Sequence, residues 1–169
     1  MGIKLNIGCG DQVLENWVNL DNKPYNEKVI KWQFGEVLPL NDGVVSVIYI
    51  AYFLMYLKLE DYKILFKECS RVLRKGGVMV IKEDNDKQRV WKAVGTNHST
   101  GFIQSTSNVV VMEKELNSAG FDPFICFVGK DIELLINMGY VFLDSHKKVM
   151  NKSYVILATK AGEFKCSEI

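Results

Sequence analysis

The sequence lacks the features that mark the more unusual classes of protein. Its 169 residues include 3 prolines and 13 glycines, too few for a collagen-like or linker-like chain. Basic and acidic residues nearly balance, 21 against 20, so the overall charge does not indicate a nucleic-acid-binding protein. With 48% hydrophobic and 24% charged residues, the composition is that of a globular protein and excludes global disorder. The length predicts one domain, residues 1–169.

Cysteine is also scarce. Cys9, Cys69, Cys126 and Cys166 form no CxxC pair, so we expect neither a metal site nor a disulfide framework. Unpaired thiols and an N-terminus without a secretory signal predict a cytoplasmic location. The longest apolar run, residues 44–57, is shorter than the ~20 residues that a membrane-spanning helix needs, so no membrane association is expected.

The chain alternates between strand-like and helix-like segments. The β-rich runs that predict strands are Ile3–Ile7, Val18–Asp21, Val29–Trp32, Val44–Ala51, Val78–Ile81, Phe124–Val128 and Tyr154–Thr159. The segments that predict helices are Glu60–Arg74, which is expected to end at Gly76-Gly77, Val109–Ala119 and a shorter one at Asp131–Met138. This alternation is typical of a doubly wound, mostly parallel α/β sheet, in which ligands bind at the carboxyl ends of the strands.

Gly8-Cys9-Gly10 follows the first predicted strand, where such a ligand-binding turn is expected. Alone, the pattern is also compatible with an ordinary turn. The dinucleotide-binding pattern needs a third glycine where Val13 stands, and residues 11–17 leave no room for a long helix facing a pyrophosphate. The turn therefore favours a ligand that carries no pyrophosphate.

Asp21 ends the second predicted strand and follows Gly8 by 13 positions. A carboxylate there can accept hydrogen bonds from both hydroxyls of a ribose. The alternative is a solvated turn residue, since Asn22 and Pro24 lie beside it. Together, the glycine turn and Asp21 favour a nucleoside without phosphates, and S-adenosylmethionine (SAM) is the usual ligand of that kind.

Five segments resemble small class I SAM-dependent methyltransferases of the type 11 group. They are LNIGCG (5–10), NWVNLD (16–21), LPLNDG (38–43), LFKECSRVLRKGG (65–77) and LNSAGF (116–121). The resemblance extends over residues 3–160. It implies a Rossmann-like sheet of seven strands with an antiparallel last strand, SAM as cofactor, and methyl transfer to a small-molecule or sugar-like acceptor. It indicates no nucleic-acid partner and leaves the oligomeric state open.

The same resemblance implies cofactor contacts at the ends of the first four strands. The residues are Asn6, Gly8, Cys9, Gly10, Asp21, Asn22, Gln33, Phe34, Ile50 and Ala51.

Several positions depart from the family pattern. Asn6 and Gln33 stand where acidic residues are common, and Ser46 replaces an aspartate of the fourth strand. Met55 and Tyr56 replace a common Glu-His pair after that strand, which removes the titratable groups expected near the transfer centre. These changes leave a second hypothesis open: a SAM-binding, catalytically weak homologue with a regulatory or scaffolding role. A nucleotide-sugar or nicotinamide enzyme is disfavoured by the missing third glycine.

Few residues are candidates for chemistry. His98 is a candidate base, and Tyr52 could place its ring near the sulfonium cation. The ordinary alternatives are an exposed loop histidine and a tyrosine packed in the core. Glu83 and Asp84 follow the fifth strand and could flank the acceptor. Residues 84–108 form a long segment there, which we expect to act as a lid or substrate loop.

Overall fold

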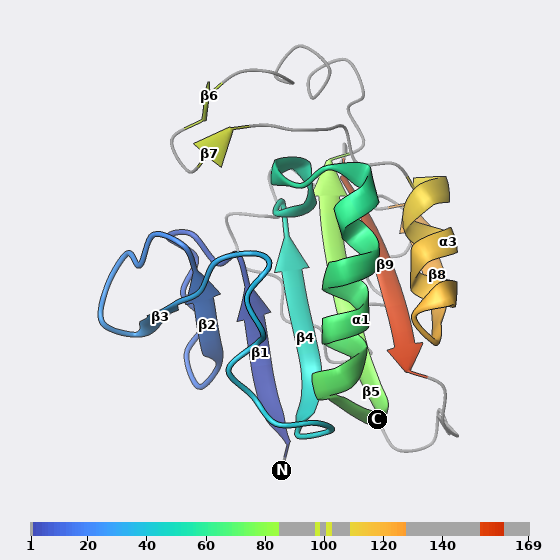
Figure 1. Cartoon of the computed structure of the whole chain (residues 1–169), viewed down its shortest axis with the longest axis horizontal. Coiled ribbons are helices and arrows are strands. Elements are labelled where there is room, and N and C mark those ends of the chain that lie inside the picture. Colours follow the sequence, from blue (N-terminus) through green and yellow to red (C-terminus); the bar gives the residue numbers. More distant parts are fainter. Residues whose placement is uncertain (1, 85–96, 99–100, 103–108, 128–152, 161–169) are drawn as a thin grey trace.

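Seven strands form one twisted sheet that carries the candidate site (Figure 1). The computed structural model describes residues 2–84, 97–98, 101–102, 109–127 and 153–160. The strands of this sheet are β1 (Ile3–Ile7), β2 (Val18–Asp21), β3 (Val29–Lys31), β4 (Val45–Ala51), β5 (Leu73–Asp84), β8 (Phe121–Phe127) and β9 (Ser153–Lys160). A separate pair, β6 (Asn97–His98) and β7 (Gly101–Phe102), forms a two-stranded sheet.

The order of the strands is β3-β2-β1-β4-β5-β9-β8. Neighbours from β3 to β5 pair in parallel, while β9 is antiparallel to both β5 and β8. The mostly parallel α/β sheet and its antiparallel last strand are thereby confirmed. The order reverses between β1 and β4, and in sheets of this kind that is where a crevice opens for a ligand.

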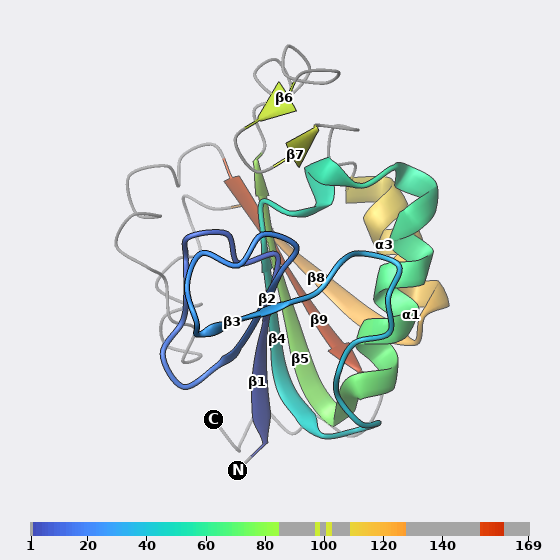
Figure 2. The ribbon, with the colours of Figure 1, turned by 60° about the vertical axis from the view of Figure 1, so that its left-hand side comes forward.

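The two described α-helices, α1 (Tyr62–Val72) and α3 (Val109–Ser118), cover the same face of the sheet (Figure 2). Two 3-10 turns, η1 (Leu54–Tyr56) and η2 (Leu59–Asp61), lead from β4 into α1. The buried residues of α1 recur every three or four positions, as expected of an amphipathic helix, and are Tyr62, Leu65, Phe66, Cys69 and Val72. Burial of each such apolar side chain is worth about 1.5–3 kcal/mol, which holds α1 on the sheet.

The prediction for the end of the first helix was wrong. The helix ends at Val72, and Leu73 turns into extended backbone and pairs with Val45 of β4. Gly76, at a φ of +69°, therefore lies inside β5 and does not cap the helix. The end of α1 is held instead by Lys160 of β9, whose Nζ donates to the carbonyls of Ser70 at 2.6 Å and Leu73 at 2.8 Å.

Other boundaries differ by a few residues. β5 begins at Leu73 and extends to Asp84, whereas Val78–Ile81 was expected. β8 spans Phe121–Phe127 where Phe124–Val128 was expected, because Phe121 already pairs with Lys160. The predicted helix at Asp131–Met138 and most of the segment 84–108 lie outside the described residues.

The contact between Lys160 and the end of α1 predicts a measurable loss of stability on substitution. Lys160→Met removes two charged hydrogen bonds and leaves helix carbonyls without these donors, so the free energy of unfolding should fall by about 1–3 kcal/mol. Lys114→Met on the exposed side of α3 is the control and should change it by less than about 0.5 kcal/mol. Urea unfolding measures both, and equal effects would contradict the capping role.

Candidate functional site

A cavity of about 490 Å³ lies at the carboxyl ends of β1, β2 and β4. Nine of the ten expected cofactor contacts line it: Asn6, Gly8, Cys9, Gly10, Asp21, Asn22, Gln33, Phe34 and Ala51. Ile50 is not among the lining residues. Its side chain is fully buried in the core on the helix-covered face, because adjacent residues of a strand point to opposite faces. Of the two residues expected to contact the cofactor at the end of β4, Ala51 lines the cavity and Ile50 does not.

The glycine turn folds back onto the end of β2. The backbone N–H groups of Gly8 and Cys9 both donate to the carbonyl of Leu20, at 2.9 and 3.1 Å. Gly8 and Gly10 have φ values of +66° and +53°, which residues with a side chain rarely adopt. A Cβ atom on Gly8 would lie 2.3 Å from the ring of Phe53, whereas one on Gly10 would meet nothing within 4 Å. The turn therefore packs tightly at Gly8 and stays open at Gly10.

Asp21 is oriented by the backbone on both sides of its carboxylate. Its Oδ2 accepts from the N–H of Gly10 and its Oδ1 from the N–H of Lys23, both at 2.9 Å. A carboxylate has about four acceptor positions, so each oxygen keeps capacity for one more donor. Asp21 lines the cavity and is partly exposed, so this capacity is available to two hydroxyl groups of a ligand.

Asn6 and Asn19 form a buried amide pair behind the turn. The Nδ2 of Asn6 donates to the carbonyl of Gln12 at 3.0 Å and to Oδ1 of Asn19 at 2.9 Å. Asn19 in turn exchanges hydrogen bonds with both backbone groups of Leu14 and donates to the carbonyl of Trp17. The pair fixes the segment between β1 and β2, which contains no helix. Asn19 was missed at the sequence level because an asparagine between apolar residues resembles any strand residue.

The segment after β3 forms a further wall of the cavity. Trp32 is buried, its Nε1 donates to the carbonyl of Glu36 at 3.1 Å, and its ring centroid lies 6.4 Å from that of Phe53. Gln33 is exposed, and its backbone N–H donates to the Glu36 carboxylate at 2.9 Å. Phe34 is half-buried beside it. An apolar wall with an amide at its rim suits a flat heteroaromatic ring.

Tyr52 occupies an unusual position at the end of β4. Its φ is +53°, its N–H donates to the carbonyl of Lys82 at 2.8 Å, and its side chain lines the cavity. The Nζ of Lys82 lies 5.2 Å from the centroid of its ring. A non-glycine residue held at positive φ is strained, which often marks a functional position. Tyr52 is thus a cavity residue rather than a core residue.

Lys82 is fully buried on β5, and its Nζ has no hydrogen-bond partner within the described ranges. Burial lowers the pKa of its ammonium group to about 8. The neighbouring Glu83 points to the opposite, helix-covered face, where its Oε1 accepts from the N–H of Leu54 at 2.9 Å. Lys82 was not predicted as a site residue, since a lysine in a strand usually lies at the surface.

Cys9 is the middle residue of the glycine turn, and its thiol is not a nucleophile in this state. Burial and the nearby Asp21 carboxylate raise the pKa of Cys9 to about 12, so the thiol stays protonated. His98 lies in β6, and its side chain is outside the described residues, so its proposed role stays a prediction. In the described ranges no group of three or more His, Cys, Asp and Glu side chains is arranged to hold a metal ion.

Known proteins share this architecture. Residues 15–81 match the family model described as a methyltransferase domain. A SAM-dependent methyltransferase from Archaeoglobus fulgidus superposes with a TM-score of 0.63 at 18% identity, over 94% of this chain and 86% of that one. One from Methanosarcina mazei gives 0.63 at 16% identity, over 95% and 92%. The comparison with curated protein sequences finds no match.

The fold is therefore that of class I methyltransferases, and residues 15–81 resemble their methyltransferase domain. The transferase class and the SAM cofactor expected from the sequence agree with this match. The geranyl diphosphate C-methyltransferase of Streptomyces coelicolor, at 14% identity and a TM-score of 0.58, is a further structural neighbour over 95% of this chain and 71% of that one. At these identities the structural neighbours establish the shared fold alone.

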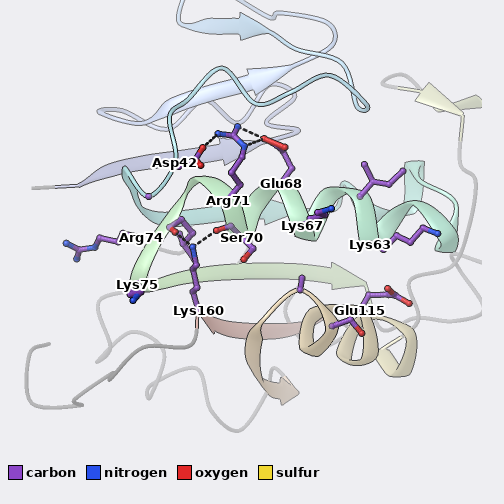
Figure 3. A pocket seen from close by; sticks show the side chains of 15 residues that line it. Asp42, Lys63, Lys67, Glu68, Ser70, Arg71, Arg74, Lys75, Glu115 and Lys160 are labelled. Carbon is purple, nitrogen blue, oxygen red and sulfur yellow. Dashed lines mark hydrogen bonds and ion pairs between the residues drawn. The ribbon is translucent and has the colours of Figure 1, made fainter.

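A larger hollow, about 1340 Å³, opens along α1 (Figure 3) and shares no described lining residue with the cavity at the glycine turn. Part of its charge is paired. Arg71 pairs with Glu68 and Asp42, which raises the pKa of Arg71, and donates to two backbone carbonyls. Lys160 donates its hydrogen bonds to the carbonyls at the end of α1. These bonds give Arg71 and Lys160 a structural role. None of the helices in the described ranges is long and apolar enough to span a membrane.

The two glycines of the turn predict different costs of substitution. Gly8→Ala must displace the Phe53 ring as well as hold alanine at positive φ, so it should lower the free energy of unfolding by about 2–4 kcal/mol. Gly10→Ala introduces only the backbone strain of a positive φ and should lower the free energy of unfolding by about 1 kcal/mol. Denaturant unfolding of both variants measures the difference, and a Gly8→Ala protein as stable as Gly10→Ala would contradict this packing.

The buried amine predicts a substitution that stabilises the protein. Between pH 8 and 10.5 the unfolded chain holds the Lys82 proton and the folded chain releases it, so the stability of the wild type rises with pH there. Below pH 8 the folded chain bears the full cost of the buried charge. Lys82→Met should therefore raise the free energy of unfolding by about 1–3 kcal/mol at pH 7, with a smaller gain at pH 9. Urea unfolding at both pH values measures this, and a gain that does not shrink with pH would contradict it.

Proposed function

We propose that the chain binds SAM in the 490 Å³ cavity and transfers its methyl group to a small-molecule or sugar-like acceptor. The observation that carries the proposal is the carboxylate of Asp21, fixed by two backbone N–H groups and still able to accept from two hydroxyls. This arrangement lies beside a glycine turn at the switch point of the sheet, where the class I fold binds its ligand.

The residues present fit the proposed cofactor. Asp21 would hold the ribose, and the open backbone at Gly10 would allow a ligand to approach closely. Phe34 and Gln33 would border the adenine, with the Gln33 amide as a neutral acceptor in place of the usual carboxylate. The short segment after the turn offers no helix N-terminus to a pyrophosphate, which matches a nucleoside without phosphates. The cavity volume lies within the range of about 300–1,000 Å³ usual for small-molecule sites.

Bound SAM supplies a methyl group activated by its sulfonium cation. The task of the protein is then to orient the acceptor in line with that group and to exclude water, which placement of aromatic side chains can achieve. Tyr52, Phe53 and Tyr56 line the cavity beyond the glycine turn. Neither Cys9, which stays protonated, nor Glu83, which points to the other face, is placed to remove a proton from an acceptor there. The chemistry proposed for the described residues is therefore mainly positioning.

A second candidate function is binding of SAM without efficient turnover, in a regulatory or scaffolding protein. It is favoured by one observation: Tyr56 lines the cavity where the family commonly has a titratable residue, and Met55 precedes it. The two candidates differ in whether the purified protein consumes SAM in the presence of acceptor mixtures.

We further propose that residues 84–108 act as the acceptor lid, that His98 assists acceptors that must lose a proton, and that the protein is cytoplasmic.

The ribose assignment predicts the effect of a substitution at Asp21. The wild type should bind SAM and S-adenosylhomocysteine (SAH) saturably by calorimetry. Asp21→Ala should weaken SAH binding at least tenfold, because charge-assisted hydrogen bonds contribute about 1.5–3 kcal/mol each at most. Asp21→Asn, of the same size, should lose less.

Asp122→Ala, at an exposed position on β8, is the matched control and should leave binding unchanged. Because Asp21 also holds the glycine turn, thermal unfolding of each variant checks that the fold is intact. A folded Asp21→Ala protein with wild-type affinity would show that the ribose is bound elsewhere.

A further inference from the structure

Lys82 is a buried charge without a counter-ion in the described part of the chain. Its side chain is fully buried, and no described residue forms a hydrogen bond with its Nζ. Two of the other fully or nearly fully buried polar side chains, Asn6 and Asn19, are bonded through their amides, and Glu83 accepts from a backbone N–H. Burying an ammonium group without partners is costly, so its retention calls for an explanation beyond packing.

The position of Lys82 relates it to the cofactor cavity. Lys82 pairs with Ala51 across β4 and β5, and it shares a sheet face with Ala51, Tyr49 and Asn6, all of which line the cavity. Its Nζ lies 5.2 Å from the ring of Tyr52, which also lines the cavity. The ring of Tyr52 thus contacts a buried amine and borders the space proposed for the cofactor.

The electron-rich ring of a tyrosine attracts cations, and the ammonium group of Lys82 already lies over the ring of Tyr52. A sulfonium placed in the cavity would meet both this shared ring and the positive charge of Lys82. SAH has a neutral thioether sulfur in place of the sulfonium, so neither the ring nor the charge of Lys82 would act on it in this way. The two forms of the cofactor therefore differ in how they respond to the charge on Lys82.

We propose that Lys82 is a specificity-determining residue that sets the preference of the cavity for SAM over SAH, through its charge and through Tyr52. The neutral amine accommodates the sulfonium, and the ammonium form opposes it. This inference rests on the proposed SAM site. Binding of SAM moves the equilibrium of Lys82 from –NH3⁺ to –NH2, and the proton passes to the buffer. Binding of SAH causes no such release.

The groups around Lys82 agree with this role. Tyr49 and Tyr52 face it from β4 and from the residue after it, and burial raises the pKa of Tyr49, which keeps that phenol neutral. Glu83 lies on the opposite face of β5, and Asp21 lies at the end of β2, two strands away from β4. Since burial lowers the pKa of Lys82 to about 8, both charge states are within reach near neutral pH.

Calorimetry with SAM and SAH between pH 6.5 and pH 9 tests the inference. For the wild type, the affinity for SAM should rise at least about fivefold relative to that for SAH across this range. At pH 7, SAM binding measured in phosphate and in Tris should show release of up to one proton, and SAH binding should show none. A ratio of affinities that does not change with pH, or equal proton release for both ligands, would overturn the inference.

Two variants isolate the charge. Lys82→Met should bind both ligands with a ratio independent of pH and release no proton. Lys82→Arg, which stays charged, should bind SAH but should keep the weaker SAM affinity of the low-pH wild type at every pH. If Lys82→Met keeps the pH dependence of the wild type, another group is responsible and the inference fails. If the wild type binds neither SAM nor SAH, the proposed function itself fails, a result distinct from binding without pH dependence.

Discussion

The amide of Asn19 holds the turn on which the cavity depends. Two parallel strands are usually joined by a crossover of a dozen or more residues that contains a helix. Between β1 and β2 this chain has ten residues and no helix, so the backbone groups of that segment need other partners. Asn19 forms four hydrogen bonds: it accepts from the N–H of Leu14 and the amide of Asn6, and it donates to the carbonyls of Leu14 and Trp17. With the segment fixed in this way, Gly8 and Gly10 meet the end of β2 and orient Asp21.

The division of the sheet into two faces explains the rest of the site. One face packs against α1 and α3 through apolar residues such as Ile48, Ile50 and Met79. The other carries Lys82 together with Asn6, Tyr49 and Ala51, and the last three of these side chains line the cavity. The strict alternation of a strand lets one residue stabilise the core while its neighbour serves the site. Lys82 is buried on this second face without a carboxylate partner among the described residues, which makes its charge state responsive to its surroundings.

The sequence allowed the glycine turn, the first four strands and the class of the fold to be predicted because each depends on local patterns. Gly8-Cys9-Gly10 and Asp21 lie at strand ends that short apolar runs already mark. The end of α1 was not predictable in this way, since Lys160, some ninety positions away, holds its last carbonyls. Lys82 was missed for a related reason: its burial follows from the pairing of β4, β5 and β9, which no local pattern reveals. The roles of His98 and of residues 84–108 stay predictions.

The most direct test of the account is a crystal structure of the chain grown with SAH. The account predicts the ligand in the cavity at the ends of β1, β2 and β4, with both ribose hydroxyls within hydrogen-bond distance of Asp21 and the adenine beside Phe34 and Gln33. The sulfur should lie toward Tyr52. SAH bound in the hollow along α1, or in the cavity with its ribose away from Asp21, would contradict the central claim.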